Sequence, residues 1–175
     1  VSSPVKTIAD GIAVKNGSEI TLQYLKEYVD EVVAVDDEEI ASAILYLLEN
    51  HKIIVEGAGA VGVASVMHKK FDFDKYKNIA VITSGGNIDV TMLSVIIEKG
   101  LVKSNRKLKL QITLIDKHGS LKNLTEVFDK LGANIVHIGY DRTDTSISYG
   151  DANVSIDLEI KGSEHRKEIE NALQN

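Results

Sequence analysis

The residues best suited to chemistry come directly after an apolar, β-type run. Ile79–Thr83 carries no charge and is mostly β-branched, which predicts a buried strand. Ser84, Gly85, Gly86 and Asn87 follow it. Adjacent glycines let successive backbone N–H groups converge on a ligand, while the serine hydroxyl and the asparagine amide stay available. Because open α/β sheets bind ligands where their strands end, we predict a ligand site here, with a ligand-free glycine turn as the alternative.

A second group of glycines lies upstream, after an apolar segment that ends at Glu56. Gly57, Gly59 and Gly62 have the G-x-G-x-x-G spacing of dinucleotide-binding proteins. That fingerprint also needs an acidic residue at the end of the next strand to hold the ribose, and none stands there. We therefore expect these glycines to let a helix pack closely against a neighbouring backbone, with Glu56 pointing toward the same crevice as Ser84. A site for NAD or a flavin is the weaker alternative.

Two helices are predicted in the first part of the chain. One covers Ile20–Glu31 with Ser18 as its cap, and the next follows a capping box made by Asp36 and Glu39. Both carry apolar stripes at helical spacing that we expect to be core. The stripes are Leu22, Leu25, Val29 and Val32 in the first helix, and Ile40, Ala43, Ile44, Leu47 and Leu48 in the second.

Strand-like and helix-like segments then alternate. Short strands are predicted at 32–35 and 53–56 in addition to the run at 79–83. Further helices are expected from Gly57 to His68 and from Val90 to Lys99, the latter closed by Gly100. This alternation predicts a parallel sheet with helices packed on it.

The second part of the chain predicts the order β-α-β-β-α. The strands are Lys107–Ile115, Ala133–Arg142 with Val136, Ile138 and Tyr140 on one face, and Asn153–Ile160; the helices run from Ser120 to Gly132 and onward from Ser163. A ferredoxin-like domain has one strand more. The unpaired sheet edge that results invites pairing with another chain.

Composition narrows the class of protein. The 175 residues are 43% hydrophobic and 26% charged, which is typical of a soluble globular protein, and no segment resembles a signal peptide or a membrane span. The absence of cysteine excludes disulfides and thiolate metal sites and fits a cytoplasmic location. The net charge of −6 argues against general nucleic-acid binding. Acidic residues outnumber basic ones only before about Gly100, and this change in charge indicates a domain boundary there.

Short motifs along nearly the whole chain resemble those of threonine dehydratases, also called threonine ammonia-lyases, that carry an ACT regulatory domain. In the catalytic part they are Thr7–Gly11, Val29–Val33, Val55–Ala60 and Ser84–Asp89; in the ACT part they are Asp116–Leu121 and Gly132–Ile135.

The resemblance implies an α/β fold: residues 1–102 as the C-terminal part of a pyridoxal phosphate-dependent fold-type II domain, and residues 103–175 as a ferredoxin-like ACT domain without its last strand. Enzymes of this family convert threonine to 2-oxobutanoate and ammonia. By the same resemblance Ser84 hydrogen-bonds the pyridine nitrogen of pyridoxal phosphate, Gly85 and Gly86 line its ring, and Glu56 and Gly57 lie at its edge.

For the ACT part the resemblance implies an amino-acid effector at an interface between two ACT domains, in a homodimer or homotetramer without nucleic-acid or membrane partners. The bordering residues would be Gly119, Ser120, Leu121, Asn134 and Ile135. The family's Schiff-base lysine and phosphate cradle have no counterpart in these 175 residues, so we expect the chain alone to be inactive and to bind no pyridoxal phosphate. Two alternatives remain: a stand-alone amino-acid-binding ACT module, or part of a serine dehydratase or racemase.

Overall fold

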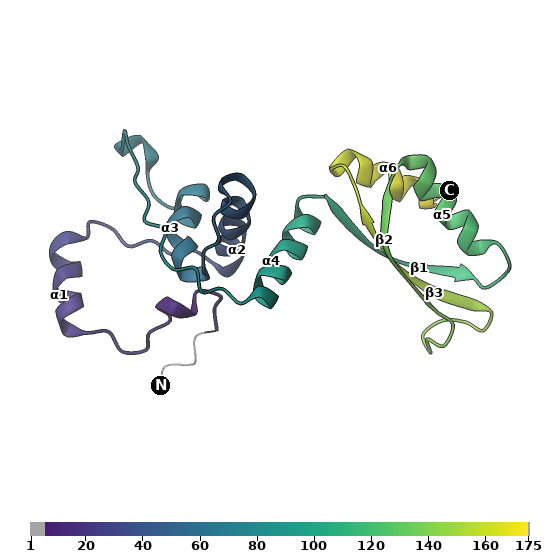
Figure 1. Cartoon of the computed structure of the whole chain (residues 1–175), viewed down its shortest axis with the longest axis horizontal. Helices are drawn as coiled ribbons and strands as arrows, with labels where there is room; N and C mark the ends of the chain where they lie inside the picture. Colours follow the sequence, from purple (N-terminus) through teal and green to yellow (C-terminus); the bar gives the residue numbers. More distant parts are fainter. Residues whose placement is uncertain (1–5, 175) are drawn as a thin grey trace. The chain divides into compact units, whose positions relative to one another are not determined.

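The computed structural model describes residues 6–174, which divide into two compact units, the first ending at Ile97 and the second beginning at Glu98 (Figure 1). The first unit contains η1 (Asp10–Ile12), α1 (Glu19–Tyr28), α2 (Asp37–Tyr46), the π-helical turn η2 (Leu47–His51), α3 (Gly57–Met67), η3 (Phe73–Lys75) and the beginning of α4 (Val90–Lys103). The second contains β1 (Lys107–Ile115), α5 (Ser120–Leu131), β2 (Asn134–Asp141), β3 (Asp151–Glu159) and α6 (Ser163–Gln174).

Among residues 6–174, no helix combines the length and the hydrophobicity needed to cross a bilayer. Nor do three or more histidine, aspartate or glutamate side chains of that part of the chain gather in a way that could hold a metal ion.

The core of the first unit lies between α2 and α3. The predicted capping box that begins α2 is confirmed: the Asp36 carboxylate accepts from the Glu39 N–H, and the Glu39 carboxylate accepts from the Asp36 N–H, both at 2.9 Å. The α2 stripe packs against the alanines of α3, whose small side chains let the two helices approach closely. The buried residues of this core are Ala9, Ile40, Ala43, Ile44, Leu47, Val55, Ala60, Ala64 and Ile96.

Strands are absent from the described part of the first unit, so the predictions at 32–35, 53–56 and 79–83 are wrong for this structure. The run Ile79–Thr83, predicted to be a buried strand, is exposed, and Ile82 is 87% accessible. A strand forms by hydrogen bonding to a second strand, and no described segment of this unit pairs with any of the three. The expected parallel sheet is therefore not formed within residues 6–97.

Helix α1 also departs from the sequence-based expectation. Its apolar stripe was expected to be core, but no residue of α1 is buried, and Leu22, Leu25 and Val29 are all more than two-fifths exposed. Ser18 occupies the N-cap position without a side-chain capping bond. Periodicity shows which face of a helix can be buried, and burial additionally requires a second surface, which the described residues do not supply.

Helix α4 continues past Gly100, where the sequence predicted its end, and stops at Lys103. Glycine favours a helix end only when it adopts a left-handed conformation, and Gly100 is not among the positive-φ residues. Its carbonyl instead accepts from the Ser104 N–H at 2.9 Å.

The second unit is a three-stranded antiparallel sheet in the order β1-β3-β2. The predicted β-α-β-β-α order is confirmed, β1 has the predicted bounds, and α5 ends at Gly132, whose φ is +69°. Alternate residues of β3 are buried under α5 and α6 because side chains alternate between the faces of a strand. The core consists of Leu108, Leu124, Phe128, Val154, Ile156, Leu158, Ile160 and Ile169.

A bulge changes which side chains of β2 face this core. Ile135 pairs with Leu158 and His137 with Asp157, so Val136 lies between two ladder positions and has no partner of its own. Val136 is half exposed, so the prediction that it shares a face with Ile138 and Tyr140 is wrong. Ile135 packs on the core in its place. Alternation along a strand predicts faces only while the ladder is regular.

A buried histidine joins the two helices of this unit. The Nδ1 atom of His165 accepts from the Lys161 N–H, and its Nε2 lies 3.0 Å from the Leu131 carbonyl oxygen. A ring that accepts at Nδ1 carries its proton at Nε2, so the Nε2–H of His165 donates to the Leu131 carbonyl. The beginning of α6 is thereby fixed to the end of α5.

Candidate functional site

In the first unit, helix α3 packs directly on the segment that contains the predicted ligand site. A Cβ atom at Gly59 would overlap the Ser84 carbonyl group, and one at Gly62 would come within 2.8 Å of Val81 Cγ1. Any side chain at Gly59 would therefore displace the turn. The glycines serve close helix-to-backbone packing, as predicted, and the space beside Gly59 is filled by protein.

Glu56 and Gly85 also lie in contact. The Glu56 N–H donates to the Gly85 carbonyl at 3.2 Å, and Gly85 has a φ of +72°, a conformation that favours glycine. A Cβ atom there would come within 2.9 Å of both carboxylate oxygens of Glu56. The structure thus brings together Glu56 and Gly57, at the N-terminus of α3, and the Ser84-Gly85 turn.

The polar side chains of this turn are open to ligands. Ser84 and Asn87 are exposed, and neither side chain hydrogen-bonds any other residue in the described range. Further along, Asp89 accepts from both the N–H and the hydroxyl of Thr91 at 2.7 Å, which begins α4 and holds the pKa of Asp89 below its usual value. The Ser84 hydroxyl and the Asn87 amide are therefore both available to hydrogen-bond a ligand at this site.

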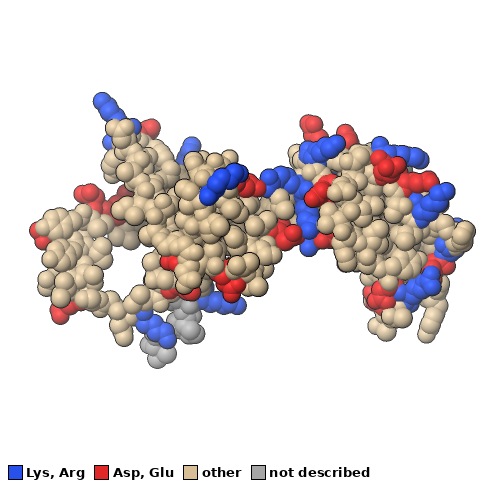
Figure 2. Space-filling view, in the orientation of Figure 1, with Lys and Arg blue, Asp and Glu red and all other residues tan. Residues whose placement is uncertain are grey.

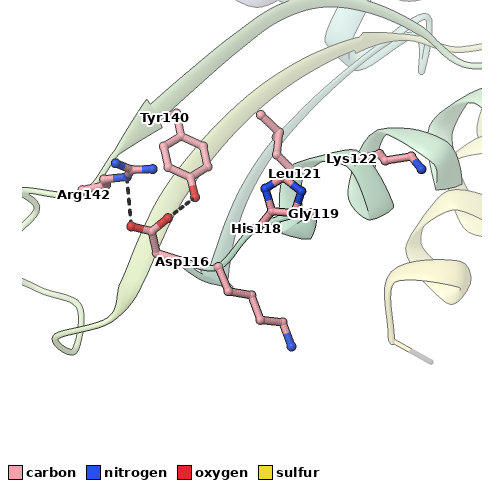
Figure 3. A pocket seen from close by; sticks show the side chains of 8 residues that line it. Asp116, His118, Gly119, Leu121, Lys122, Tyr140 and Arg142 are labelled. Carbon is pink, nitrogen blue, oxygen red and sulfur yellow. Dashed lines mark hydrogen bonds and ion pairs between the residues drawn. The ribbon is translucent and has the colours of Figure 1, made fainter.

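A second candidate site lies in the other unit, where β1 and β2 both end next to the beginning of α5 (Figure 3). The cavity has a volume of about 640 Å³. It is lined by Asp116, Lys117, His118, Gly119, Leu121, Lys122, Tyr140 and Arg142. β1 and β2 run parallel on either side of β3, so residues that follow β1 and residues at the end of β2 meet at one edge of the sheet.

Asp116 holds the polar groups of this cavity together. Tyr140 donates its hydroxyl proton to Asp116 Oδ1 at 3.0 Å, and Arg142 Nε lies 2.9 Å from Oδ2 (Figure 3). The guanidinium also lies over the Tyr140 ring, 5.5 Å from its centroid. Loss of solvent around the hydroxyl, together with the Asp116 carboxylate, raises the pKa of Tyr140, so this hydroxyl remains a donor at neutral pH.

The five predicted effector residues do not meet within one chain. Gly119 and Leu121 line the cavity, and Ser120 between them is the first residue of α5. Asn134 and Ile135 begin β2, and Tyr140 lies six positions after Asn134, or roughly 20 Å along a strand. The Asn134 amide instead donates to Glu159 at 2.7 Å.

Comparisons with known proteins bear on both units. Residues 1–85 match the family described as pyridoxal-phosphate dependent enzyme, and residues 103–175 match the ACT domain. The L-threonine ammonia-lyase of Thermotoga maritima is 48% identical over 167 residues, which are 95% of this chain and 41% of that protein. The L-threonine ammonia-lyase of Geobacter sulfurreducens is 45% identical over 168 residues, which are 96% of this chain and 42% of that protein.

The chain therefore carries, in order, a segment that matches the pyridoxal-phosphate dependent enzymes and a segment that matches the ACT domain. The resemblance found in its motifs is thereby confirmed. The chain spans about two-fifths of the length of these two relatives. One solved structure, that of a threonine deaminase, is 31% identical with a TM-score of 0.45, and the match covers 51% of this chain and 32% of that one.

The pyridoxal-phosphate dependent enzyme segment fits one edge of its family's cofactor. The Ser84 hydroxyl has no competing partner among residues 6–174, whereas the space beside Gly85 is taken by the Glu56 carboxylate. A neutral hydroxyl can share a hydrogen bond with a pyridine nitrogen without protonating it fully. When bound, pyridoxal phosphate supplies the electron sink for elimination chemistry.

In the ACT domain, sequence reasoning missed part of the cavity lining. Asp116 and His118 were predicted as part of a turn and of the ACT-like motif Asp116–Leu121 but not as site residues, and Tyr140 and Arg142 only as members of a strand. The sequence did contain an indication of this cavity: the β-α-β order predicts that β1 and β2 run parallel and end at the same edge of the sheet. Polar residues at both strand ends were therefore candidates for one site.

Proposed function

We propose that this chain works as part of a pyridoxal phosphate-dependent threonine ammonia-lyase whose ACT domain senses an amino acid. The observation that supports this proposal most directly is the presence of both family segments in one chain, with relatives named L-threonine ammonia-lyase that match 95% and 96% of it. The domain boundary would lie near residues 102 and 103, at the end of α4.

Within the proposed enzyme, Ser84 holds the ring nitrogen of the cofactor, and Gly85 and Gly86 lie against the ring. Glu56 and Gly57 form the adjoining edge, where the Glu56 N–H already fixes the Gly85 carbonyl. The Ser84 hydroxyl keeps the ring nitrogen from full protonation, which favours elimination over chemistry that needs a stronger electron sink.

We further propose that residues 1–175 alone neither hold the cofactor nor turn over threonine. A lysine that bonds such a cofactor must be partly removed from water, and the lysines of the described first unit lie in exposed or half-exposed positions. The test mixes the purified chain with pyridoxal phosphate and L-threonine, measures 2-oxobutanoate, and repeats the assay on the complete natural protein. The complete protein should be active and lose activity on Ser84→Ala, whereas Asn50→Ala, at an exposed residue of η2, should leave it active.

For the ACT domain we propose an effector that is a small amino acid bound beside Gly119, Ser120 and Leu121. The cavity at this turn has a volume within the range of small-molecule sites and carries both charged and apolar groups. Calorimetric titration of the chain with L-isoleucine, L-valine, L-threonine and L-serine tests the proposal. Binding of none of them at millimolar concentration would contradict it.

Asn134 and Ile135 border the proposed site from a second copy of the chain, Ile135 through its backbone because its side chain packs on its own core. They lie at the far end of the sheet from the cavity, and β2 is an edge strand, which presents unpaired backbone groups to a partner. Association would therefore complete a site that one chain leaves open. Effector affinity should then rise with association state and fall on Asn134→Ala, while Asn171→Ala on α6 should leave it unchanged.

The stand-alone amino-acid-binding module remains a second candidate. It is favoured by the second unit's own core and cavity, which use only residues from 98 onward. The two candidates differ in the complete natural protein: a module binds the amino acid and shows no 2-oxo acid production, whereas the lyase shows both. Production of a 2-oxo acid from serine rather than threonine would indicate a serine dehydratase.

A further inference from the structure

The ACT-domain cavity carries an unusual balance of charge. Its lining includes one carboxylate, that of Asp116, and the basic side chains of Lys117, His118, Lys122 and Arg142. Around this domain, positive and negative side chains are otherwise interspersed (Figure 2). An excess of basic groups around one cavity favours a ligand that carries a negative charge.

Arg142 differs from the other basic residues because its head group is held in place. Nε is bonded to Asp116 at 2.9 Å, and the guanidinium plane lies over the Tyr140 ring. Tyr140 is in turn fixed by its own hydrogen bond to Asp116. By contrast, Lys122 is exposed and makes a 3.4 Å ion pair with Glu126 one turn along α5.

The contacts of Arg142 leave most of its donors unused. A guanidinium has five N–H groups, and the contact with Asp116 engages Nε. The Tyr140 hydroxyl is the other polar group that acts on the guanidinium, and the side chain is 67% exposed while lining the cavity, so terminal N–H groups remain for a ligand. A guanidinium with terminal N–H groups available matches a carboxylate in a two-bond arrangement.

We propose that Arg142 binds the carboxylate of the amino-acid effector and is the residue that makes this cavity select amino acids over amines and amides. This inference rests on the effector function proposed above. Asp116 has lone pairs left on both carboxylate oxygens, so it can accept the ligand's ammonium group beside the guanidinium. The Leu121 side chain and the Tyr140 ring supply apolar contacts for a small aliphatic side chain.

Pre-positioning explains why an exposed arginine can contribute to affinity. An unrestrained arginine loses side-chain freedom when it binds a ligand, and that loss offsets much of the gain. Asp116 and the Tyr140 ring already restrict Arg142 in the free protein. The ligand therefore meets a guanidinium whose orientation is largely set.

The test pairs a change in the protein with a change in the ligand. L-Isoleucine and L-isoleucinamide, which lacks the carboxylate charge, are titrated calorimetrically into the wild-type chain and into Arg142→Gln. Loss of a charged two-bond contact should weaken isoleucine binding about 10- to 100-fold, with isoleucinamide binding changed less than about threefold. Arg142→Lys retains the positive charge but not the paired N–H donors of the guanidinium. Its isoleucine affinity should lie between those of the wild type and Arg142→Gln.

A matched control is available on α6. Arg166 Nε lies 2.8 Å from Glu170, much as Arg142 Nε lies 2.9 Å from Asp116, and Arg166 does not line the cavity. Arg166→Gln should bind isoleucine as the wild type does. Far-UV circular dichroism and the melting temperature verify that each variant is folded.

Four results would overturn the inference, and they are distinguishable. Equal binding of isoleucine by wild type and Arg142→Gln, or an equal loss of isoleucine and isoleucinamide, contradicts the role of Arg142 and leaves the effector function standing. Binding of inorganic phosphate as tight as that of isoleucine indicates a general anion site. Failure of the wild type to bind any of the four amino acids contradicts the effector function and this inference together.

Discussion

Replacing Gly59 with alanine should move the Ser84-Gly85 turn and destabilise the first unit. Gly59 lies in α3, and its Cα faces the Ser84 carbonyl group so closely that an added Cβ would come within 2.8 Å of the carbonyl carbon and closer still to the oxygen. Real Cβ atoms essentially never approach within 3.0 Å of another heavy atom. Since the obstacle is backbone, no side-chain rotation can relieve the overlap.

Two opposing effects set the size of the change. Alanine is favoured over glycine within a helix by up to about 1 kcal/mol, which would stabilise α3. Overpacking a close contact costs about 1–3 kcal/mol, and a backbone obstacle belongs at the upper end of that range. We therefore expect a net loss of about 1–2 kcal/mol.

The matched control is Gly62→Ala on the same helix. Its Cβ would come within 2.8 Å of Val81 Cγ1, a side-chain atom that can move, so the helix preference should roughly cancel the contact cost. Urea unfolding gives the stability difference, and hydrogen exchange of residues 79–89 reports the displaced turn. A Gly59→Ala chain as stable as Gly62→Ala, with unchanged exchange in that segment, would refute the packing argument.

Other predictions concern capping, pH and the ACT-domain core. Asp36→Ala removes half of the capping box of α2 and should cost about 1 kcal/mol in urea unfolding, whereas Ser18→Ala should be nearly neutral because Ser18 makes no side-chain capping bond. Hydrogen bonds from Ser146 and from the Asn153 amide lower the pKa of Asp144 to about 2. Because the Asp144 pKa is lowered, the ionised carboxylate stabilises the folded chain at pH values above 3.8, and this stabilisation is lost as the pH falls toward 2. Ser146→Ala removes one of the hydrogen bonds, so NMR titration should give a higher Asp144 pKa in that variant. Phe128→Ala empties a fully buried site and should cost about 3–5 kcal/mol, measured by urea unfolding and by faster hydrogen exchange in β3.

Much of the ACT domain could be predicted from sequence because its strands find their partners within it. The polar–apolar alternation of β1 is regular from Lys107 to Leu114, and β3 pairs with all nine residues of the strand. The end of α5 was predictable because Gly132 takes the left-handed conformation that closes a helix. The bulge at Val136 was not, because nothing in the local pattern marks the extra residue.

In the first unit, local sequence patterns predicted a helix cap correctly but could not predict which segments pair with one another. The capping box at Asp36 depends only on residues three apart and was therefore predictable. The residue types of Ile79–Thr83 favour a β-strand, but residue types do not tell whether a second strand lies beside the segment to pair with it. The same holds for the apolar face of α1, which the described residues leave exposed; Figure 2 shows broad uncharged areas on this unit.

The candidate sites also differ in whether they depend on local sequence or on the arrangement of distant segments. The contact between Gly59 and Ser84 was predictable because small residues on a helix indicate close approach, whatever the fold around them. The Arg142 cavity depends on two strand ends meeting at one edge of the sheet, which the order of elements implies. That geometry also separates Asn134 from Gly119 within a chain. One copy can therefore supply the carboxylate contact, and contacts from Asn134 require a second copy, so effector binding and chain association should strengthen each other.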